Sequence, residues 1–211
     1  GITVRNDTGV QEGGEISMFY DPMIAKLITH APSRAAAIEA QTHALDAFYV
    51  DGIRHNIPFL SALMTHPRWR EGNLSTGFIA EEFPKGFSAS VPDGEIARRI
   101  AAVGAAIDRV LGERKRQISG QMIGRAVIRE RRRCVWLERT EIPLDVIREG
   151  EGFVVRFANP DGSLGQPHLL ESPWVPGDPV WEGTIDGRPI AVQVRPIPNG
   201  VRLAHHGYEV A

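Results

Sequence analysis

Hydrophobic residues recur with a helical period between residues 95 and 115. Ile96, Ile100, Val103 and Ile107 are three or four residues apart and therefore form one stripe on a helix. Alanine and glycine fill many of the positions between them, which widens the apolar sector far beyond one stripe. Because a helix that is apolar on most sides must be enclosed, we expect a long helix surrounded by its own domain.

From residue 117 onward the pattern changes to short apolar runs typical of β-strands. The Asp186-Gly187 and Asn199-Gly200 pairs between runs favour tight hairpins, because these residues accept the backbone conformation that such turns require. The pattern predicts an antiparallel meander of about seven or eight strands, and closing it into a barrel around the helix would leave no open edge. The predicted strands are Met122–Ile128, Cys134–Leu137, Leu144–Ile147, Phe153–Phe157, Val180–Ile185, Ile190–Val194 and Val201–Ala204.

The first 87 residues mix strand-like and helix-like segments. The apolar runs Ile16–Tyr20 and Met23–Ile28 suit strands, and the polar residues between them indicate a bend. Ser33, Asn56 and Thr76 each precede a helix-like segment and are predicted N-caps of three short helices. Strands and short helices together predict an α+β unit that is too small to be a whole enzyme.

Residues 88–94, Ser-Ala-Ser-Val-Pro-Asp-Gly, have the composition of a linker. The predicted organisation is therefore a first domain of residues 1–87, a linker of residues 88–94 and a second domain of residues 95–211. The expected fold class is α+β, with a strand-and-helix unit followed by an antiparallel β-barrel around a long helix.

Charge is spread unevenly along the chain. Residues 95–148 carry 13 Lys and Arg against 7 Asp and Glu, although the net charge of the chain is only −2. Because the basic run of residues 129–133 lacks interleaved aromatic residues, a hairpin tip or protein-binding surface is expected rather than a nucleic-acid site. Arg131 and Arg132 in this run are candidate interface residues.

Three further features of the sequence limit the class of protein. No apolar stretch approaches the roughly 18 residues needed to span a bilayer, so we expect a soluble protein with no membrane partner. The single cysteine excludes an internal disulfide and suits a reducing compartment. The seven histidines show no H-x-x-x-H spacing, so no metal site is expected.

Two tryptophans and the cysteine are ambiguous. Trp174 and Trp181 lie near predicted turns, and the sequence leaves open whether they are core anchors or interface hot spots. Cys134 opens the apolar run Cys-Val-Trp-Leu, which favours a buried and inert thiol.

Asp21 and Lys26 place opposite charges on one short segment. Because proline restricts the residue before it, Pro22 limits the direction in which the Asp21 carboxylate leaves the bend. The two charges form either a local ion pair at a sheet corner or part of a catalytic site. The neighbouring Gly13-Gly14 pair lacks the pattern of a phosphate-binding loop.

The segment EGGEISMFYDPMIAKLI, followed by DGIRHNIPFL from Asp51, resembles the last part of the biotin carboxylase domain of biotin-dependent carboxylases. Within that group, the α subunits of propionyl-CoA carboxylases are the most similar family. The resemblance is dense over residues 1–87, where YDPMIAKL is the most specific run, and looser over residues 88–211.

The resemblance implies a function for both parts. The full-length subunit would use ATP, magnesium and bicarbonate to carboxylate biotin, and the carboxyl group would then pass to propionyl-CoA on the β subunit. In this family a long helix inside an antiparallel barrel, the BT domain, docks the α subunit onto the carboxyltransferase β subunit. The partners implied are that β subunit and the biotin carrier domain of the same α subunit.

The resemblance also implies roles for three residues. Asp21 would orient a catalytic arginine near the biotin and bicarbonate pocket, and Lys26 would add positive potential there. Thr76 falls near the adenine of ATP, although many relatives carry an aliphatic residue at that position. No cofactor is expected on this chain alone, because the ATP-binding and biotin-bearing elements are not recognisable in it.

Several alternatives stay open. The chain alone is expected to be inactive, and its full-length parent would work in a bacterial cytoplasm or a mitochondrial matrix. The chain is otherwise a non-catalytic assembly module, or part of the α subunit of a related enzyme such as methylcrotonyl-CoA or acetyl-CoA carboxylase.

Overall fold

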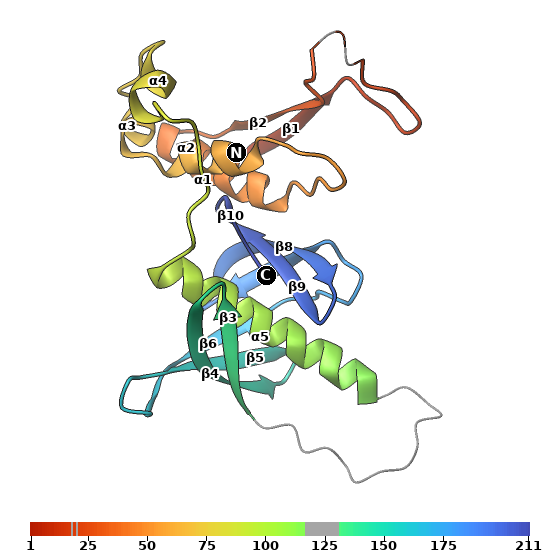
Figure 1. The fold of residues 1–211 in the computed structure, drawn as a ribbon, viewed down its shortest axis with the longest axis vertical. Coiled ribbons are helices and arrows are strands. Elements are labelled where there is room, and N and C mark those ends of the chain that lie inside the picture. Colours follow the sequence, from red (N-terminus) through yellow and green to blue (C-terminus); the bar gives the residue numbers. More distant parts are fainter. Residues whose placement is uncertain (18, 20, 117–130) are drawn as a thin grey trace. The chain divides into compact units, whose positions relative to one another are not determined.

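The computed structural model describes residues 1–17, 19, 21–116 and 131–211 (Figure 1). The chain forms two compact units, Gly1–Ser88 and Ala89–Ala211, called unit 1 and unit 2 below. Each unit has a hydrophobic core made only of its own residues.

Unit 1 contains a two-stranded antiparallel sheet and four helices. In the sheet, Asp7 lies opposite Lys26. The strands are β1 (Thr3–Thr8) and β2 (Ala25–His30), and the helices are α1 (Arg34–Ala47), α2 (Ile57–Thr65), α3 (Pro67–Glu71) and α4 (Phe78–Glu82). Both the strands and the helices of the expected α+β unit are therefore present.

The predicted cap at Ser33 is confirmed, and the one at Thr76 is wrong. The Ser33 hydroxyl accepts a hydrogen bond from the Ala36 N–H at 3.2 Å and so satisfies one free donor of α1. α4 begins one residue later than expected: Gly77 takes the cap position, and the Gly77 N–H donates to the Ser75 hydroxyl at 3.2 Å.

The second predicted cap is confirmed in position only. Asn56 precedes α2, but its side chain makes no capping hydrogen bond. α2 ends at Thr65, directly before His66-Pro67. Pro67 also opens the unpredicted helix α3, because a proline in the first helical turn needs no N–H partner.

The expected strand Ile16–Tyr20 is wrong for the residues that the structure describes. Residues 16, 17 and 19 are not in a strand, and Met18 and Tyr20 lie outside the described residues. β1 pairs with β2 over six positions, so residues 9–24 form the connection between the two strands. Phe19 is 92% exposed on this connection. The run predicted as Met23–Ile28 is a strand that starts two residues later, at Ala25.

The core of unit 1 lies where its helices meet. Ile38 and Leu45 of α1 pack with residues of α2 and α4, namely Leu63, Met64 and Phe78. The Thr29 hydroxyl lies 2.9 Å from Oε1 of Gln41 and ties β2 to α1.

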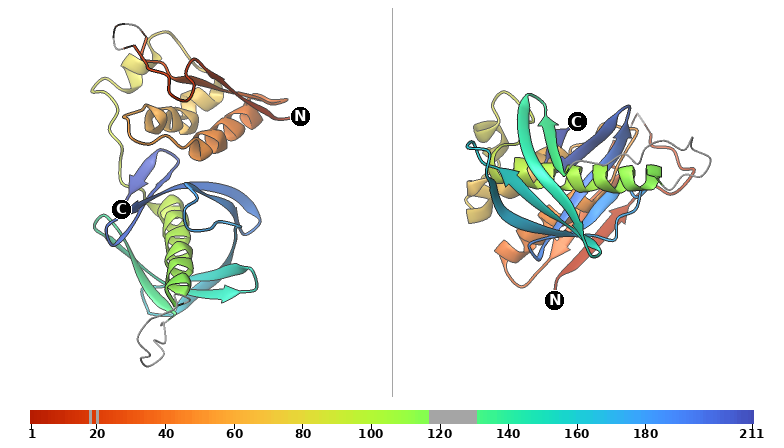
Figure 2. Two further views of the ribbon diagram at one scale, coloured as in Figure 1. Left: turned by 90° about the vertical axis from the view of Figure 1, so that its right-hand side faces the viewer. Right: turned by 90° about the horizontal axis from the view of Figure 1, so that it is seen from below.

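Unit 2 consists of the long helix α5 (Gly94–Arg116) and one eight-stranded antiparallel sheet (Figures 1 and 2). Each strand pairs with the next one along the chain, so the sheet is a meander. The strands are β3 (Arg132–Leu137), β4 (Thr140–Glu149), β5 (Gly152–Ala158), β6 (Leu164–Glu171), β7 (Val180–Ile185), β8 (Arg188–Ile197), β9 (Gly200–His205) and β10 (Tyr208–Val210).

The prediction of an enclosed helix is confirmed. The sheet curves around α5, as the left view of Figure 2 shows, and the helix contacts β3, β4, β6 and β9. Ile100, Val103 and Ile107 are at most 1% exposed, and the alanines between them are buried as well. Small residues let the strands come close: a Cβ atom at Gly104 would lie 3.3 Å from Cδ1 of Leu203.

Closure of the sheet into a barrel is not observed among the described residues. β3 and β10 are the two ends of the strand order, and no pairing joins them in this part of the chain. The predicted strand Met122–Ile128 lies outside the described residues. The fold class and the enclosure of the helix therefore match the expectation. The expected closure of the sheet into a hydrogen-bonded barrel is not observed among the described residues.

The predicted hairpins are confirmed by the backbone. Asp186 and Gly187 both have positive φ angles, 52° and 73°, as the tightest hairpin turn requires. Asn199 has a φ of 66° at the turn between β8 and β9. β6 and β10 were not predicted, because Gly165 and Pro167 interrupt the first and the second is only three residues long.

Candidate functional site

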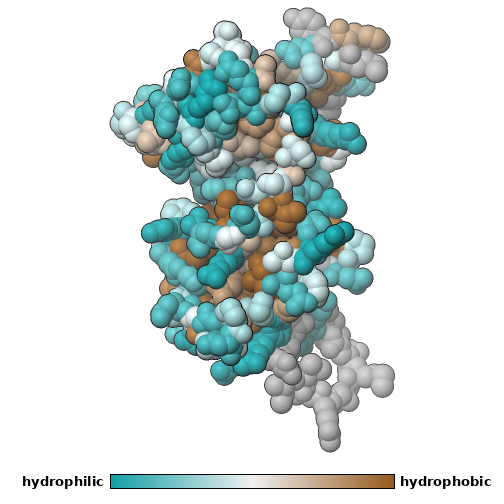
Figure 3. Space-filling model, turned by 60° about the vertical axis from the view of Figure 1, so that its left-hand side comes forward, coloured by the Kyte–Doolittle hydropathy of each residue, from teal (hydrophilic) through white to brown (hydrophobic). Residues whose placement is uncertain are grey.

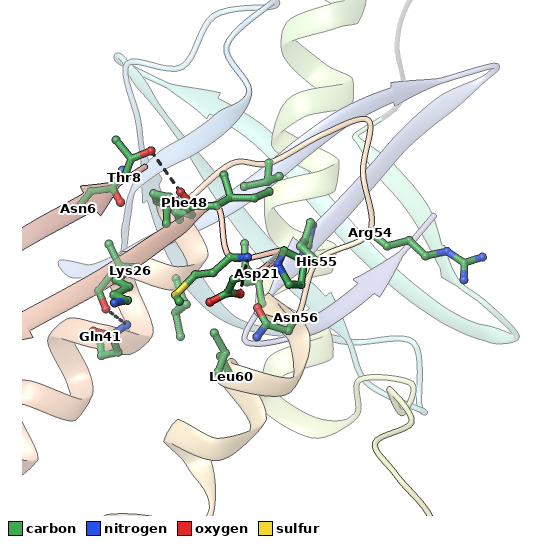
Figure 4. Close-up of a pocket in the computed structure, with 18 residues that line it drawn as sticks. Asn6, Thr8, Asp21, Lys26, Gln41, Phe48, Arg54, His55, Asn56 and Leu60 are labelled. Atoms are coloured by element: carbon green, nitrogen blue, oxygen red, sulfur yellow. Dashed lines mark hydrogen bonds between the residues drawn. The ribbon is translucent and has the colours of Figure 1, made fainter. Parts of the chain in front are cut away.

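Unit 1 has a cavity of about 840 Å³ that is lined by both Asp21 and Lys26 (Figure 4). Its walls come from β1, β2 and the segment before β2, and from the end of α1 and the start of α2. Apolar side chains such as Leu45, Phe48 and Leu60 line much of it. The cavity therefore has the mixed character of a binding site, with polar groups on a mostly apolar wall.

Asp21 is held in place by the backbone of its own turn. Oδ1 of Asp21 accepts a hydrogen bond from the Met23 N–H at 3.0 Å, which closes a local turn across Pro22. The carboxylate is exposed at the cavity and keeps further lone pairs for another donor.

Lys26 reaches the same cavity from β2 but does not pair with Asp21. No ion pair between the two is found in the described part of the chain. Asp7, which lies opposite Lys26 in the sheet, instead binds Nε of Arg5 at 2.9 Å. Of the two alternatives left open by the sequence, a local ion pair between Asp21 and Lys26 is thus not observed.

The opposite wall carries polar residues that the sequence did not indicate as site residues. His55 and Asn56 precede α2 and line the cavity, while the Arg54 side chain extends away from Asp21 and Lys26 (Figure 4). Nδ1 of His55 is buried and has no hydrogen-bond partner among the described residues. The signal for these residues was the run DGIRHN, which the sequence analysis used to recognise a family and, at Asn56, to predict a helix cap.

The cavity does not fit ATP with magnesium on its own. Asp21 is the only carboxylate among the described residues that line it, and a magnesium–nucleotide site needs several oxygen ligands and a phosphate cradle. Gly13, Gly14 and Thr76 are not among the lining residues. Thr76 is exposed in the turn before α4. Unit 1 therefore offers one wall of a site rather than a complete one.

A second polar cluster in unit 1 is structural in character. Nη1 of Arg68 lies 2.6 Å from Glu82 and 2.8 Å from Glu81, and thereby joins α3 to α4. The hydrogen bond from Arg68 holds the pKa of Glu82 below its usual value. The Arg68 guanidinium also lies over the Phe78 ring at 5.2 Å, so the cluster covers the core.

The candidate interface residues of unit 2 fall into two groups. Trp174 and Trp181 are 8% and 3% exposed and belong to the core, which is the first of the two alternatives for them. Nε1 of Trp174 donates to the Asp178 carbonyl at 3.0 Å, so its polar end is satisfied inside the unit. Arg131 and Arg132 are exposed, whereas Arg129 and Glu130 of the same run lie outside the described residues.

Cys134 is exposed, so the expectation of a buried thiol is wrong. It points to the face of β3 that lies away from the core, because strand residues alternate between the two faces.

In the described part of the chain, no helix is long and apolar enough to cross a membrane.

Comparisons with known proteins match both units. The sequence model of the biotin carboxylase C-terminal domain matches residues 1–81, and that of the propionyl-coenzyme A carboxylase BT domain matches residues 100–211. The propionyl-CoA carboxylase alpha chain of Ruegeria pomeroyi is 45% identical over 208 residues, which cover 98% of this chain and 30% of that protein.

Two further relatives match about half of the chain. The mitochondrial propionyl-CoA carboxylase alpha chain of Caenorhabditis briggsae is 38% identical over 50% of this chain and 14% of its own length. The mitochondrial methylcrotonoyl-CoA carboxylase subunit alpha of Dictyostelium discoideum is 33% identical over 54% of this chain and 16% of its own length. The chain thus spans no more than 30% of the length of these three relatives.

Proposed function

This chain belongs to the propionyl-coenzyme A carboxylase BT domain family, and from that premise we propose that it works as the assembly portion of a biotin carboxylase α subunit. The observation that carries the proposal is the match of the BT family over residues 100–211, which coincide with α5 and its enclosing sheet. Unit 2 docks the α subunit onto the carboxyltransferase β subunit.

Unit 1 is proposed as the C-terminal part of the biotin carboxylase domain. The match over residues 1–81 and the cavity lined by Asp21 support this role. The proposed boundaries are residues 1–87 for this part, 88–94 for the linker and 95–211 for the docking domain. The 45% identity to the Ruegeria pomeroyi alpha chain favours propionyl-CoA carboxylase, and the methylcrotonoyl-CoA relative supports a related enzyme as the second candidate.

The chemistry is completed outside this chain. ATP, magnesium and bicarbonate, bound by other parts of the subunit, supply the activated carboxyl group that biotin receives on a carrier domain. The residues of unit 1 hold one wall of that site. The Asp21 carboxylate, fixed by the Met23 N–H, orients an arginine of the rest of the subunit, and Lys26 adds positive charge beside it. Thr76 stays a proposed neighbour of the adenine.

The partners and the location follow from the same proposal. The chain works with the β subunit and with the biotin carrier domain of its own subunit. The alpha chains that it resembles come from a bacterium and from mitochondria, which supports work in a bacterial cytoplasm or a mitochondrial matrix.

Changing Asp21 to alanine in the full-length α subunit tests the role of unit 1. Removal of the orienting carboxylate is expected to lower the rate of free-biotin carboxylation by about 10- to 100-fold, since misplacing one catalytic group costs about this much. Binding of the β subunit should not change. Steady-state kinetics of ATP-dependent biotin carboxylation and a pull-down with the β subunit measure the two effects.

Asp7→Ala is the matched control for this experiment. It removes another exposed carboxylate of unit 1, which pairs with Arg5 among the residues that the structure describes. We expect near-wild-type kinetics for it. Equal turnover of the Asp21→Ala variant and the wild type would show that Asp21 has a purely structural role.

A further inference from the structure

The eight-stranded sheet of unit 2 has a narrow joint between β6 and β7. Most neighbouring strands overlap further: β4 pairs with β5 at six positions, and β7 pairs with β8 at six. β6 and β7 pair at only two positions, Leu170 with Ile185 and Glu171 with Thr184. We call this joint the β6–β7 seam. Because each strand pairs with its neighbours along the chain, the seam divides the sheet into strands β3–β6 and strands β7–β10.

One end of the seam is held by a close approach of the two backbones. β6 ends at Glu171, and residues 172–179 leave the sheet before β7 begins. A Cβ atom at Gly183 would clash with the Glu171 carbonyl oxygen, so only glycine fits where the strands meet. The Ser172 hydroxyl then donates a hydrogen bond to the Glu182 carbonyl at 2.5 Å. At this end, a side-chain hydrogen bond therefore stands where the strand ladder has already ended.

The other end of the seam is held by Asp186, the first residue of the turn between β7 and β8. Its N–H donates to the Leu169 carbonyl at 2.9 Å. Its Oδ1 accepts from the Leu169 N–H at 2.9 Å, and its Oδ2 lies 2.7 Å from Nδ1 of His168. Because an ionised carboxylate can only accept, Nδ1 of His168 carries the hydrogen and donates it. The carboxylate replaces a third ladder pair, and we call it the Asp186 latch.

The surroundings of the latch keep it charged. Partial burial raises the pKa of Asp186, but the hydrogen bonds from His168 and the Leu169 N–H outweigh this effect and the net shift is downward. The positive charge of Arg188 acts in the same direction as these bonds. The carboxylate is therefore ionised at neutral pH, and its hydrogen bonds are of the stronger, charge-assisted kind. Its side chain is 47% exposed, so solvent weakens them in part.

The closed seam covers part of the core of unit 2. Leu170 on the β6 side is fully buried, and Ile185 on the β7 side packs against the same core. In the connection of residues 172–179, Trp174 is buried in that core, whereas Val175 is 56% exposed. The face of unit 2 in Figure 3 is mainly hydrophilic, with smaller hydrophobic areas between the polar side chains. Separation of β6 from β7 would thus expose apolar side chains that the closed sheet covers.

We propose that unit 2 opens locally at the β6–β7 seam, without unfolding as a whole, and that the Asp186 latch sets how often it opens. Proteins open first where few hydrogen bonds and contacts hold a segment, and the seam has only two ladder positions. α5 contacts β3, β4 and β6 of the first half and β9 of the second, so it stays with the first half. This inference does not depend on what unit 2 binds.

Hydrogen–deuterium exchange of the 211-residue chain, followed by NMR at pH 7, tests the proposal. Hydrogen-bonded pairs alternate along an antiparallel ladder, so the pair after Leu169 and Asp186 is Glu171 with Thr184. The amides of Glu171 and Thr184 therefore report on the seam without bonding to the latch. The amide of Val155 is the reference, because β5 is paired on both sides. In the wild type, we expect both seam amides to exchange faster than the reference.

Asp186→Gly removes the latch and keeps a residue that accepts the positive φ of 52° at this position. We expect it to speed exchange at Glu171 and Thr184 about 10-fold, the effect of losing one net hydrogen bond to a charged, half-exposed group. Asp186→Asn should give a smaller increase, since its amide oxygen still accepts from the Leu169 N–H.

Asn199→Gly is the matched control. Asn199 also has a positive φ, 66°, in a turn between two strands of unit 2. Its side chain makes no hydrogen bond to the rest of the described chain, so the substitution changes the backbone freedom of a turn without removing a latch. We expect wild-type exchange at Glu171 and Thr184 in this variant.

Each outcome decides one part of the proposal. Wild-type seam amides that exchange no faster than Val155 would show that unit 2 opens only as a whole, and this measurement needs no variant. Faster seam exchange that Asp186→Gly and Asp186→Asn leave at the wild-type rate would show that Asp186 is not the latch. The same conclusion follows if Asn199→Gly speeds seam exchange as much as Asp186→Gly does.

Discussion

Removal of residues 88–211 from the full-length α subunit is expected to abolish its binding to the β subunit. The physical reason is that all of unit 2 is lost, including α5 and the whole eight-stranded sheet. Unit 1 keeps its own core of Ile38, Leu45, Leu63, Met64 and Phe78, to which unit 2 contributes no residue. Carboxylation of free biotin should therefore persist. Co-purification with a tagged β subunit and a free-biotin assay measure the two activities.

The control for this deletion is the complete subunit carrying the Val175→Ala substitution, which should retain both activities. Retained binding after the deletion would refute the assignment of docking to unit 2. Loss of biotin carboxylation together with binding would show that unit 1 depends on unit 2, in spite of its separate core.

Replacing Ile107 by alanine is expected to lower the free energy of unfolding of unit 2 by about 2–5 kcal/mol. Ile107 is 1% exposed at the centre of α5, where the sheet surrounds the helix. The substitution removes three side-chain carbons and leaves a cavity that the enclosing strands cannot fully close. A loss of this size is a large fraction of the stability of a typical domain.

Urea denaturation followed by circular dichroism measures this effect. Because the two cores are separate, only the transition of unit 2 should move to lower denaturant. Ile107→Val, which removes one methyl group, should cost only about 0.5–1.5 kcal/mol. Arg114→Lys at an exposed position of the same helix should cost less than about 0.5 kcal/mol. A loss below about 1 kcal/mol for Ile107→Ala would contradict the enclosure of α5.

The long helix was predictable from the sequence because its pattern of apolar residues is compatible with a single structure. A stripe at Ile96, Ile100, Val103 and Ile107 with alanines beside it fits only a helix that is covered on most sides. The hairpins were predictable for a similar reason, since Asp-Gly and Asn-Gly pairs accept positive φ angles. Both patterns depend on residues close together in the sequence, so the local structure that they predict does not depend on distant parts of the chain.

The exposure of Cys134 and Trp136 was not predictable. In the run Cys-Val-Trp-Leu every residue is apolar, so the pattern shows a strand but does not show which face is inward. The structure puts Val135 and Leu137 inward and leaves the other two at the surface. The same limit applies to the closure of the sheet, which depends on strand ends far apart in sequence.

The candidate site of unit 1 was predictable in its residues but not in its contacts. Asp21 and Lys26 do line one cavity, as their spacing indicated. The sequence could not show that the Asp21 carboxylate accepts a hydrogen bond from the Met23 N–H. Nor could it show that His55 and Asn56 form the opposite wall of the cavity. The hydrogen bond to Met23 is local, but His55 and Asn56 lie roughly 30 residues from Asp21 in the sequence, and their approach is set by the packing of α1 against α2.

The most direct test of the central claim is the mass of the complex that this 211-residue chain forms with the β subunit, measured by sedimentation velocity. Docking by unit 2 predicts a single species heavier than either component, with the free chain depleted until the β subunit is saturated. Two species that sediment independently at micromolar concentrations of both proteins would contradict the account.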